Sequence, residues 1–283
     1  MNPPPELQEL PRTIDDVLHE LDFLVASAIE KQSRLGYFAA LYRKVTRRVK
    51  EGIESGYFEN GPRMERLDVV FADRYLEALR LFERGEKPSA AWQVAFEAAG
   101  RWRPLILQQL LVGINAHINL DLGIAAATVA PGSELAALRT DFDRINEILF
   151  SLVAEVEKAI GAVSPWIALL EKIGGRVGDA LIRFSLRIAR DEAWRFAEKL
   201  AAHAAESWPP EIADKDRETA WLGQEILSPG PILRWGLLLI RMRESSDVRR
   251  VIELLAATPE TSFAAMEEQR QTRASAAART GKT

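Results

Sequence analysis

Residues 105–124 read LILQQLLVGINAHINLDLGI and are apolar on nearly every face of a helix. A helix that is apolar all round lies inside a protein, surrounded by other helices. Pro104 suits the first turn of such a helix, because its missing N–H would have no partner there. We therefore predict that this segment, continuing to about Ala127, is the buried central helix of the fold.

The rest of the chain also predicts helices. Apolar residues recur at helical spacing, and no stretch alternates apolar and polar residues as a strand would. Caps and helix breakers place further helices at about residues 13–33, 36–55, 63–84, 89–100, 131–162, 164–174, 177–207, 211–227, 231–244 and 247–256. The expected fold is an all-α, single multi-helix domain built around the central helix.

The domain organisation follows from the same pattern. We expect an N-terminal arm at 1–11, a main helical bundle at 12–175 and a C-terminal helical layer of the same domain at 176–266. A weak seam falls at Gly174-Gly175. Residues 267–283 are mostly Ala, Arg, Thr, Gln and Ser, with little to bury, and are predicted to be a disordered tail.

Composition excludes several function classes. The 283 residues are 47% hydrophobic and 28% charged, as in folded globular proteins. A net charge of −4 argues against a dedicated nucleic-acid binder, which needs concentrated positive charge. There is no cysteine, so there can be no disulfide, thiolate site or cysteine nucleophile. We expect a cytoplasmic protein, because we find neither a secretory signal nor about 18 uncharged apolar residues for a membrane span.

The polar residues of the central helix are the informative ones. His117 and Asp121 are four residues apart and share one face, while Asn115 and Asn119 share another. Each of these groups needs a hydrogen-bond partner inside a core, since an unpaired buried group costs about 1–3 kcal/mol. The two amides could hold a ligand carbonyl or bridge helix backbones, and bridging is the favoured interpretation.

Neighbouring helices offer further polar groups. Asp68 falls within the apolar arc of its helix and is predicted to be buried, whereas Asp73 falls on the charged arc. In the helix at 131–162, Asn146 borders the apolar stripe and Asp143 lies further out. The expected cluster contains His117, Asp121 and Asp68, with Asp143, Asn115, Asn119 or Asn146 nearby.

Three stretches carry a family resemblance. They are LDVVFADRYL at 67–76, GINAHINLDL at 113–122 and DFDRIN at 141–146. Together they resemble an uncharacterised bacterial family, the domain-of-unknown-function family five-nine-nine-five. The resemblance covers roughly Phe38 to Leu200, with Leu41-Tyr42 and residues 190–194 as weaker anchors. It implies a helical fold and brings no established activity or substrate, and the basic tail lies outside it.

Three interpretations of the His117/Asp121 pair stay open. The pair could ligate a divalent metal with Asp68 and Asp143, in an oxygen-rich site that activates water for hydrolysis. Asp121 could instead orient His117 as a metal-free general base. The cluster could also be a structural core network without chemistry.

The leading hypothesis is a metal-assisted hydrolase or related enzyme acting on a small molecule. His117, Asp121 and Asp68 would be its catalytic residues. Other ligand contacts are expected from Asn115, Asn119, Asn146 and Tyr75. The rival is a non-catalytic helical module that binds an apolar ligand or a protein partner.

Two further observations narrow the choice. The chain has no phosphate-binding Gly-x-x-x-x-Gly-Lys loop, no Gly-x-Gly-x-x-Gly fingerprint and no Gly-x-Ser-x-Gly elbow. The basic run Arg43–Lys50 could attract a phosphate, an anionic lipid or an acidic partner. Its apolar residues form a separate stripe, so a solvated basic face is the favoured interpretation.

Overall fold

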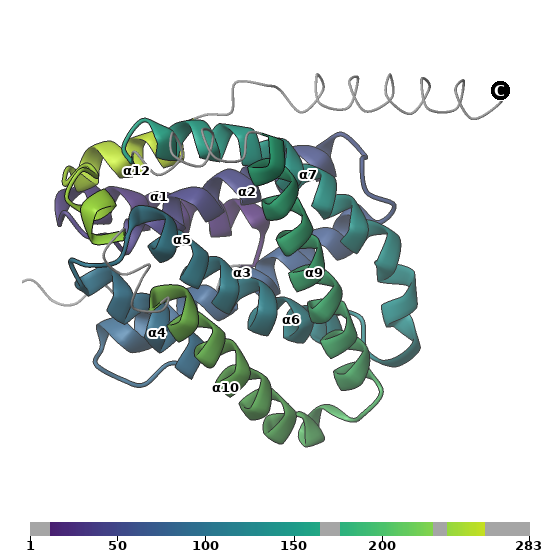
Figure 1. The fold of residues 1–283 in the computed structure, drawn as a ribbon. Helices are drawn as coiled ribbons and strands as arrows, with labels where there is room; N and C mark the ends of the chain where they lie inside the picture. Colours follow the sequence, from purple (N-terminus) through teal and green to yellow (C-terminus); the bar gives the residue numbers. More distant parts are fainter. Residues whose placement is uncertain (1–11, 165–175, 229–236, 258–283) are drawn as a thin grey trace, which may run out of the picture.

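The predicted central helix forms a buried rod of three consecutive parts. These are α5 (Ile106–Asn115), the π-helix η1 (Ala116–Asp121) and α6 (Leu122–Val129). The computed structural model describes residues 12–164, 176–228 and 237–257, with the backbone alone at 154 and 176–185. The rod runs through the middle of the molecule (Figure 1). The sequence predicted its position but not its wider π-turns.

The rod is long and apolar enough to cross a membrane by composition alone. Residues Ile106–Val129 span 24 positions with a mean hydropathy of 1.4 in their most apolar window. In the fold, 83% of that window is buried inside the protein. That burial matches a core helix surrounded by its neighbours.

Helices pack around the rod on all sides (Figure 1). Those preceding it are α1 (Ile14–Glu30), α2 (Gly36–Glu54), α3 (Gly61–Glu83) and α4 (Ala90–Gly100). Those following it are α7 (Leu135–Gly161), α9 (Arg176–Ala201), α10 (Trp208–Leu227) and α12 (Val248–Ala256), with 3-10 turns at Gly132–Glu134 and Ala205–Ser207. The parts of the chain that the structure describes contain no strand, which confirms the all-α prediction.

Two glycines let helices approach the rod closely. A Cβ on Gly113 would lie 2.6 Å from the ring of Phe38 in α2. A Cβ on Gly123 would lie 2.8 Å from the carbonyl oxygen of Ala193 in α9. Both distances are too short for any side chain, so these contacts require glycine.

Three carboxylates, two of them buried, hold the starts of helices. Asp141 of α7 accepts hydrogen bonds from two backbone amides just before α3, at 2.7 and 3.0 Å. Asp216 of α10 accepts from the first two amides of α4, at 2.7 and 2.8 Å. Glu244 accepts from the first amide of α5 at 3.1 Å. Each carboxylate satisfies N–H groups that a helix start leaves without a partner.

The prediction that the cations of Arg43–Lys50 form a solvated face is wrong for two of them. Lys44 and Arg48 are only 6% and 2% exposed. Lys44 lies 3.8 Å from Glu155 of α7, and Arg48 pairs with Glu51 at 2.8 Å. The cause is that α2 contacts five other helices: α1, α3, α5, α7 and α12. A helix with that many neighbours buries cations that one apolar stripe would leave outside.

Some predictions lie outside the described residues. These are the arm at 1–11, the helix at 164–174 with its seam at 174–175, the start of the helix at 231–244 and the tail at 267–283. The C-terminal layer is described in part: α12 contacts α1, α2 and α7.

Candidate functional site

Asp121 is the centre of a buried polar network inside the fold. It is 1% exposed and accepts hydrogen bonds from Arg74 Nε and Trp92 Nε1, both at 2.8 Å. His117 Nδ1 lies 3.3 Å from the same carboxylate. Arg74 belongs to α3 and Trp92 to α4, so one carboxylate joins the π-helix to two surrounding helices. The pairing of His117 with Asp121 confirms the expectation from their spacing.

His117 is held as a neutral imidazole. It is 3% exposed, and burial lowers its pKa below 6.5, although Asp121 opposes the shift. A neutral ring beside a carboxylate places its proton on Nδ1, which leaves a lone pair on Nε2. Among the described residues, Nε2 is buried and has no hydrogen-bond partner. The ring is therefore oriented at one nitrogen and unsatisfied at the other.

Aromatic rings form a shell around this imidazole. Phe71 stacks on it with ring centroids 3.5 Å apart, and Tyr42 meets it edge-on at 4.5 Å. The rings of Phe38, Trp92 and Tyr75 have centroids 5.6, 5.9 and 6.2 Å away. This shell excludes water, and a dry environment strengthens every electrostatic interaction inside it.

Asp68 is buried, as the sequence predicted, but it lacks the partners that buried carboxylates normally have. It is 7% exposed, and its Oδ2 forms no hydrogen bond within the described chain. Burial raises the pKa of Asp68 to about 8, and the nearby charge of Glu65 adds to the rise. The carboxyl group is therefore protonated at neutral pH and can donate a hydrogen bond or a proton.

Tyr42 lies between Asp68 and His117. Its ring touches the imidazole, and the Asp68 carboxylate is the second cause, after burial, of a Tyr42 pKa raised well above 10. The Tyr42 hydroxyl is buried next to the Thr46 hydroxyl, and their side-chain hydrogen bond partly opposes the rise of the Tyr42 pKa. The buried polar atoms of its two neighbours that lack hydrogen-bond partners in the described structure are Asp68 Oδ2 and His117 Nε2.

No hydrogen bond or ion pair joins Asp68 directly to His117 or Asp121 in the part of the chain that is described. Tyr42 is the side chain through which the predicted cluster is connected. Asp73, expected on the charged arc, is instead half-buried, with its Oδ1 unpaired and its pKa raised to about 6, chiefly by burial.

The predicted amide residues have separate roles. Asn115 donates to the backbone carbonyl of Thr219 in α10 at 2.8 Å, and Asn119 donates to Asn115 at 2.9 Å. This is the favoured helix-bridging arrangement. Asn146 of α7 is half-buried with an unpaired Oδ1. Tyr75 belongs to the aromatic shell.

The predicted metal ligands do not come together. Asp143 forms a half-exposed ion pair with Arg139 at 2.8 Å. Both oxygens of Asp121 already accept hydrogen bonds from Arg74 and Trp92. The described residues contain no group of three or more His, Asp or Glu side chains that could hold a metal ion. The residues present therefore do not fit the expected metal site.

A comparison with models of known protein families shows which family the chain belongs to. The model described as a family of unknown function (DUF5995) matches residues 14–229. The chain belongs to this family. No curated protein and no solved structure matches it.

All residues of the candidate site lie inside the DUF5995 region. The sequence interpretation missed Arg74, Trp92, Tyr42 and Phe71 as site residues. Arg74 follows Leu67 by seven residues and Phe71 by three, so it falls on the apolar arc of α3. A cation on that arc could have been recognised as a partner for a buried carboxylate. Trp92 carried no comparable signal, because its indole N–H meets Asp121 only in the folded state.

Proposed function

We propose that this protein is a small-molecule enzyme in which His117 acts as a metal-free general base, with hydrolysis as the reaction class. One observation carries the proposal: Asp68 Oδ2 and His117 Nε2 are both buried without hydrogen-bond partners among the described residues, and both residues neighbour Tyr42. By contrast, Asp121, Asp141 and Glu244 each accept at least two hydrogen bonds. Unsatisfied groups kept in a core supply the hydrogen-bonding capacity of a ligand site.

Each group has a role in the proposed mechanism. Asp121, held by Arg74 and Trp92, keeps the imidazole proton on Nδ1 and orients Nε2. Nε2 would take a proton from water as the water oxygen attacks the substrate. The protonated carboxyl of Asp68 would give its proton to the leaving group as that bond breaks. A base that is neutral and an acid that is protonated at the same pH are the pair that hydrolysis needs.

Access to the site must be gated. His117 is 3% exposed and enclosed by aromatic rings, so a substrate reaches it only when the shell opens. Opening motions of this kind limit the rate of many enzymes. We therefore expect slow turnover on test substrates.

The test is hydrolysis of p-nitrophenyl acetate and p-nitrophenyl phosphate by the purified protein. His117→Gln and Asp68→Asn should each lower kcat/KM by about 100-fold or more, the usual contribution of an acid or base. His203→Gln is the matched control, because the His203 side chain is exposed and its ring is bonded to the backbone carbonyl of Lys199, away from the His117 site. Its kcat/KM should equal that of the parent.

Metal analysis and chelation separate the two enzyme mechanisms. The metal-free mechanism predicts that a chelator leaves the activity unchanged. The metal-assisted mechanism would be favoured instead if the parent contained stoichiometric metal and the folded His117→Gln and Asp68→Asn variants had lost it. Equal activity in the parent and both folded variants would refute a catalytic role for these residues.

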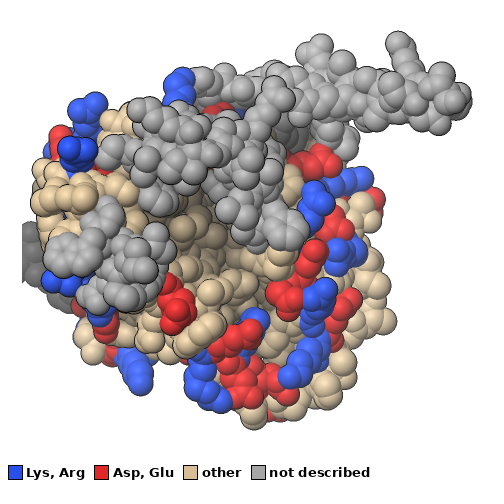
Figure 2. Space-filling view, in the orientation of Figure 1, with Lys and Arg blue, Asp and Glu red and all other residues tan. Residues whose placement is uncertain are grey.

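A non-catalytic helical module is the second candidate. It is favoured by large apolar side chains on the surface of α10, where Trp221 and Leu222 are 61% and 40% exposed. In Figure 2, uncharged residues form the visible surface where the molecule is hollowed over α5. Exposed apolar surface of this kind suits a partner. Absence of turnover, with the variants at His117 and Asp68 changing stability alone, would favour this candidate.

A further inference from the structure

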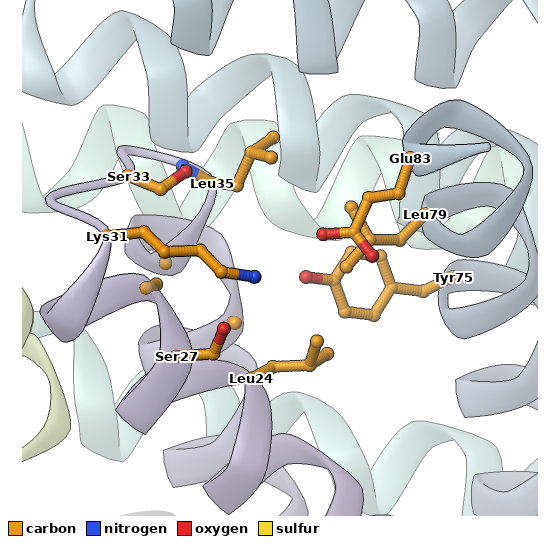
Figure 3. Close-up of a pocket in the computed structure, with 11 residues that line it drawn as sticks. Leu24, Ser27, Lys31, Ser33, Leu35, Tyr75, Leu79 and Glu83 are labelled. Atoms are coloured by element: carbon orange, nitrogen blue, oxygen red, sulfur yellow. The ribbon is translucent and has the colours of Figure 1, made fainter. Parts of the chain in front are cut away.

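A surface pocket lies where α7 begins and α9 ends (Figure 1). It encloses about 470 Å³, within the range of ~300–1,000 Å³ that is usual for pockets that hold small organic molecules. The recess between α1, α2 and α3 in Figure 3 encloses only about 30 Å³, room for about two water molecules. Of these two, the pocket beside α7 and α9 has the space for an organic ligand.

The wall of this pocket is mostly apolar and carries a carboxylate. Its apolar surface comes from α7 and from α9 with the residue that follows it: Leu135, Ala136, Trp194, Ala201 and Ala202. Ser133 supplies a hydroxyl, and among the described residues that line the pocket only Glu198 is charged. A ligand that carries a positive charge on an apolar body is complementary to such a wall.

The indole of Trp194 fixes the position of the Glu198 carboxylate. Trp194 is 5% exposed, and its ring packs edge-on against Phe142 at 4.9 Å between ring centroids. Its Nε1 donates a hydrogen bond to Glu198 Oε1 at 2.7 Å. No hydrogen bond to Glu198 Oε2 is found among the described residues. One oxygen therefore holds the carboxylate in place, which lowers the entropy cost of binding a cation at the other oxygen.

The cations near Glu198 are already paired with other carboxylates. These ion pairs are Arg139–Asp143, Arg139–Asp191, Arg195–Glu192 and Lys199–Glu211. The guanidinium of Arg139 lies 4.8 Å from the centroid of the Trp194 ring, but its charge is balanced by its two partners. In the described chain no ion pair includes Glu198. Glu198 thus brings to the pocket a negative charge that a cationic ligand can balance.

We propose that this pocket binds an organic amine, that is, a ligand with a protonated amino group on an apolar or aromatic body. The ammonium group lies on Glu198 Oε2, and the body packs on Leu135, Ala136 and Ala201. This proposal stands independently of the acid–base mechanism, because no residue that lines the pocket belongs to the polar network or the aromatic shell of His117.

2-Phenylethylamine is the probe, titrated against isotopically labelled protein up to about 50 mM, the range for weak binding. Saturable NMR shifts are expected at the Trp194 indole N–H, which is bonded to Glu198, and at the amides of Ala136 and Ala202. 2-Phenylethanol has the same shape without the charge. It should bind about 2- to 5-fold more weakly than the amine, the contribution of one exposed charge pair. 3-Phenylpropanoate, which carries a negative charge, should bind more weakly still.

Substitutions test the assigned contacts. Glu198→Gln keeps an acceptor for Trp194 but removes the charge, so it should weaken binding of the amine by about 2- to 5-fold and leave binding of the alcohol unchanged. Ala136→Trp, an exposed change that fills the pocket, should abolish the saturable shifts at Ala202. Glu225→Gln is the matched control, because Glu225 is exposed on α10 outside the pocket, and binding should equal that of the parent.

Three results would overturn the proposal. The first is the absence of saturable shifts up to about 50 mM, the limit of the titration. The second is equal binding of 2-phenylethylamine and 2-phenylethanol by the parent, or of the amine by the parent and Glu198→Gln. The third is unchanged binding by a folded Ala136→Trp variant, which would mean that the amine binds elsewhere.

Discussion

Replacing Asp68 by Asn should stabilise the protein at neutral pH and change it little in acid. The pKa of this buried carboxyl is raised from 3.8 to about 8. Asn keeps the size and the hydrogen-bonding capacity of the side chain but cannot ionise. The variant therefore isolates the energetic cost of ionising Asp68 inside the fold.

The magnitude and sign follow from proton linkage. Between pH 3.8 and about 8 the folded state holds a proton on Asp68 that the unfolded state has lost. The free energy of unfolding of the parent then falls by about 1.4 kcal/mol for each pH unit in that window. The loss reaches about 4 kcal/mol at pH 7, a large part of the 5–15 kcal/mol that stabilises a typical domain. It is fully recovered below the unfolded pKa.

Urea denaturation of parent and variant at pH 4, 6 and 8 measures the difference. Asp68→Asn should match the parent at pH 4 and exceed it increasingly toward pH 8. Other groups that titrate in this range, His117 among them, cancel in the comparison. Asp141→Asn is the control of opposite sign, because Asp141 is fully buried with two backbone amides and two arginines as donors. It should lose about 3–5 kcal/mol at pH 7.

The reasoning is refuted if Asp68→Asn is less stable than the parent at pH 8. That result would mean that Asp68 is ionised and paired in the folded protein. It would also remove the proton donor from the proposed mechanism.

Three shorter predictions concern other parts of the fold. Gly123→Ala should lower the free energy of unfolding by about 1–3 kcal/mol, since the new Cβ would lie 2.8 Å from the Ala193 carbonyl oxygen. Gly100→Ala is the control, because a Cβ there meets nothing within 4 Å and should be neutral or slightly stabilising. Thermal denaturation compares the two variants. Glu244→Ala should lower the free energy of unfolding, measured by urea denaturation, by about 2–4 kcal/mol, because it removes a buried hydrogen-bond acceptor from the start of α5. A decrease below about 0.5 kcal/mol would contradict that role. NMR of protein with ¹⁵N-labelled histidine rings should show that the His117 ring is uncharged at pH 6.5 and carries its proton on Nδ1. A ring that is half protonated at that pH would contradict the lowered pKa.

Local patterns predicted the parts of the site that depend on one helix. The all-round apolar character of residues 105–124 identified the rod, and the spacing of four brought His117 to Asp121. The position of Asp68 on an apolar arc predicted its burial. Each of these depends on neighbours along the chain, which helical periodicity describes directly.

Contacts between distant segments were not predictable in the same way. The bond from Trp92 to Asp121 joins residues 29 positions apart, and no spacing rule links them. The burial of Lys44 and Arg48 depends on the five helices that pack around α2. The separation of Asp143 from His117 likewise depends on how α7 is rotated, which its own stripe of apolar residues leaves undetermined.

The wider π-turns of the rod change the directions in which Gly113 and Gly123 face around its axis. Ten residues separate Gly113 from Gly123, and in an unbroken α-helix they would rotate by about 1,000°, leaving the two glycines about 80° apart. The wider turns at Ala116–Asp121 reduce that rotation, and the two glycines face different helices, Gly113 α2 and Gly123 α9. Nine residues of regular helix would reach nearly the same phase. The chain thus carries one surplus residue between its two close-packed faces, and that residue is absorbed in the turns that bear His117 and Asp121. Deleting one residue there would restore regular α-helical turns and change how His117 and Asp121 are presented to their neighbours.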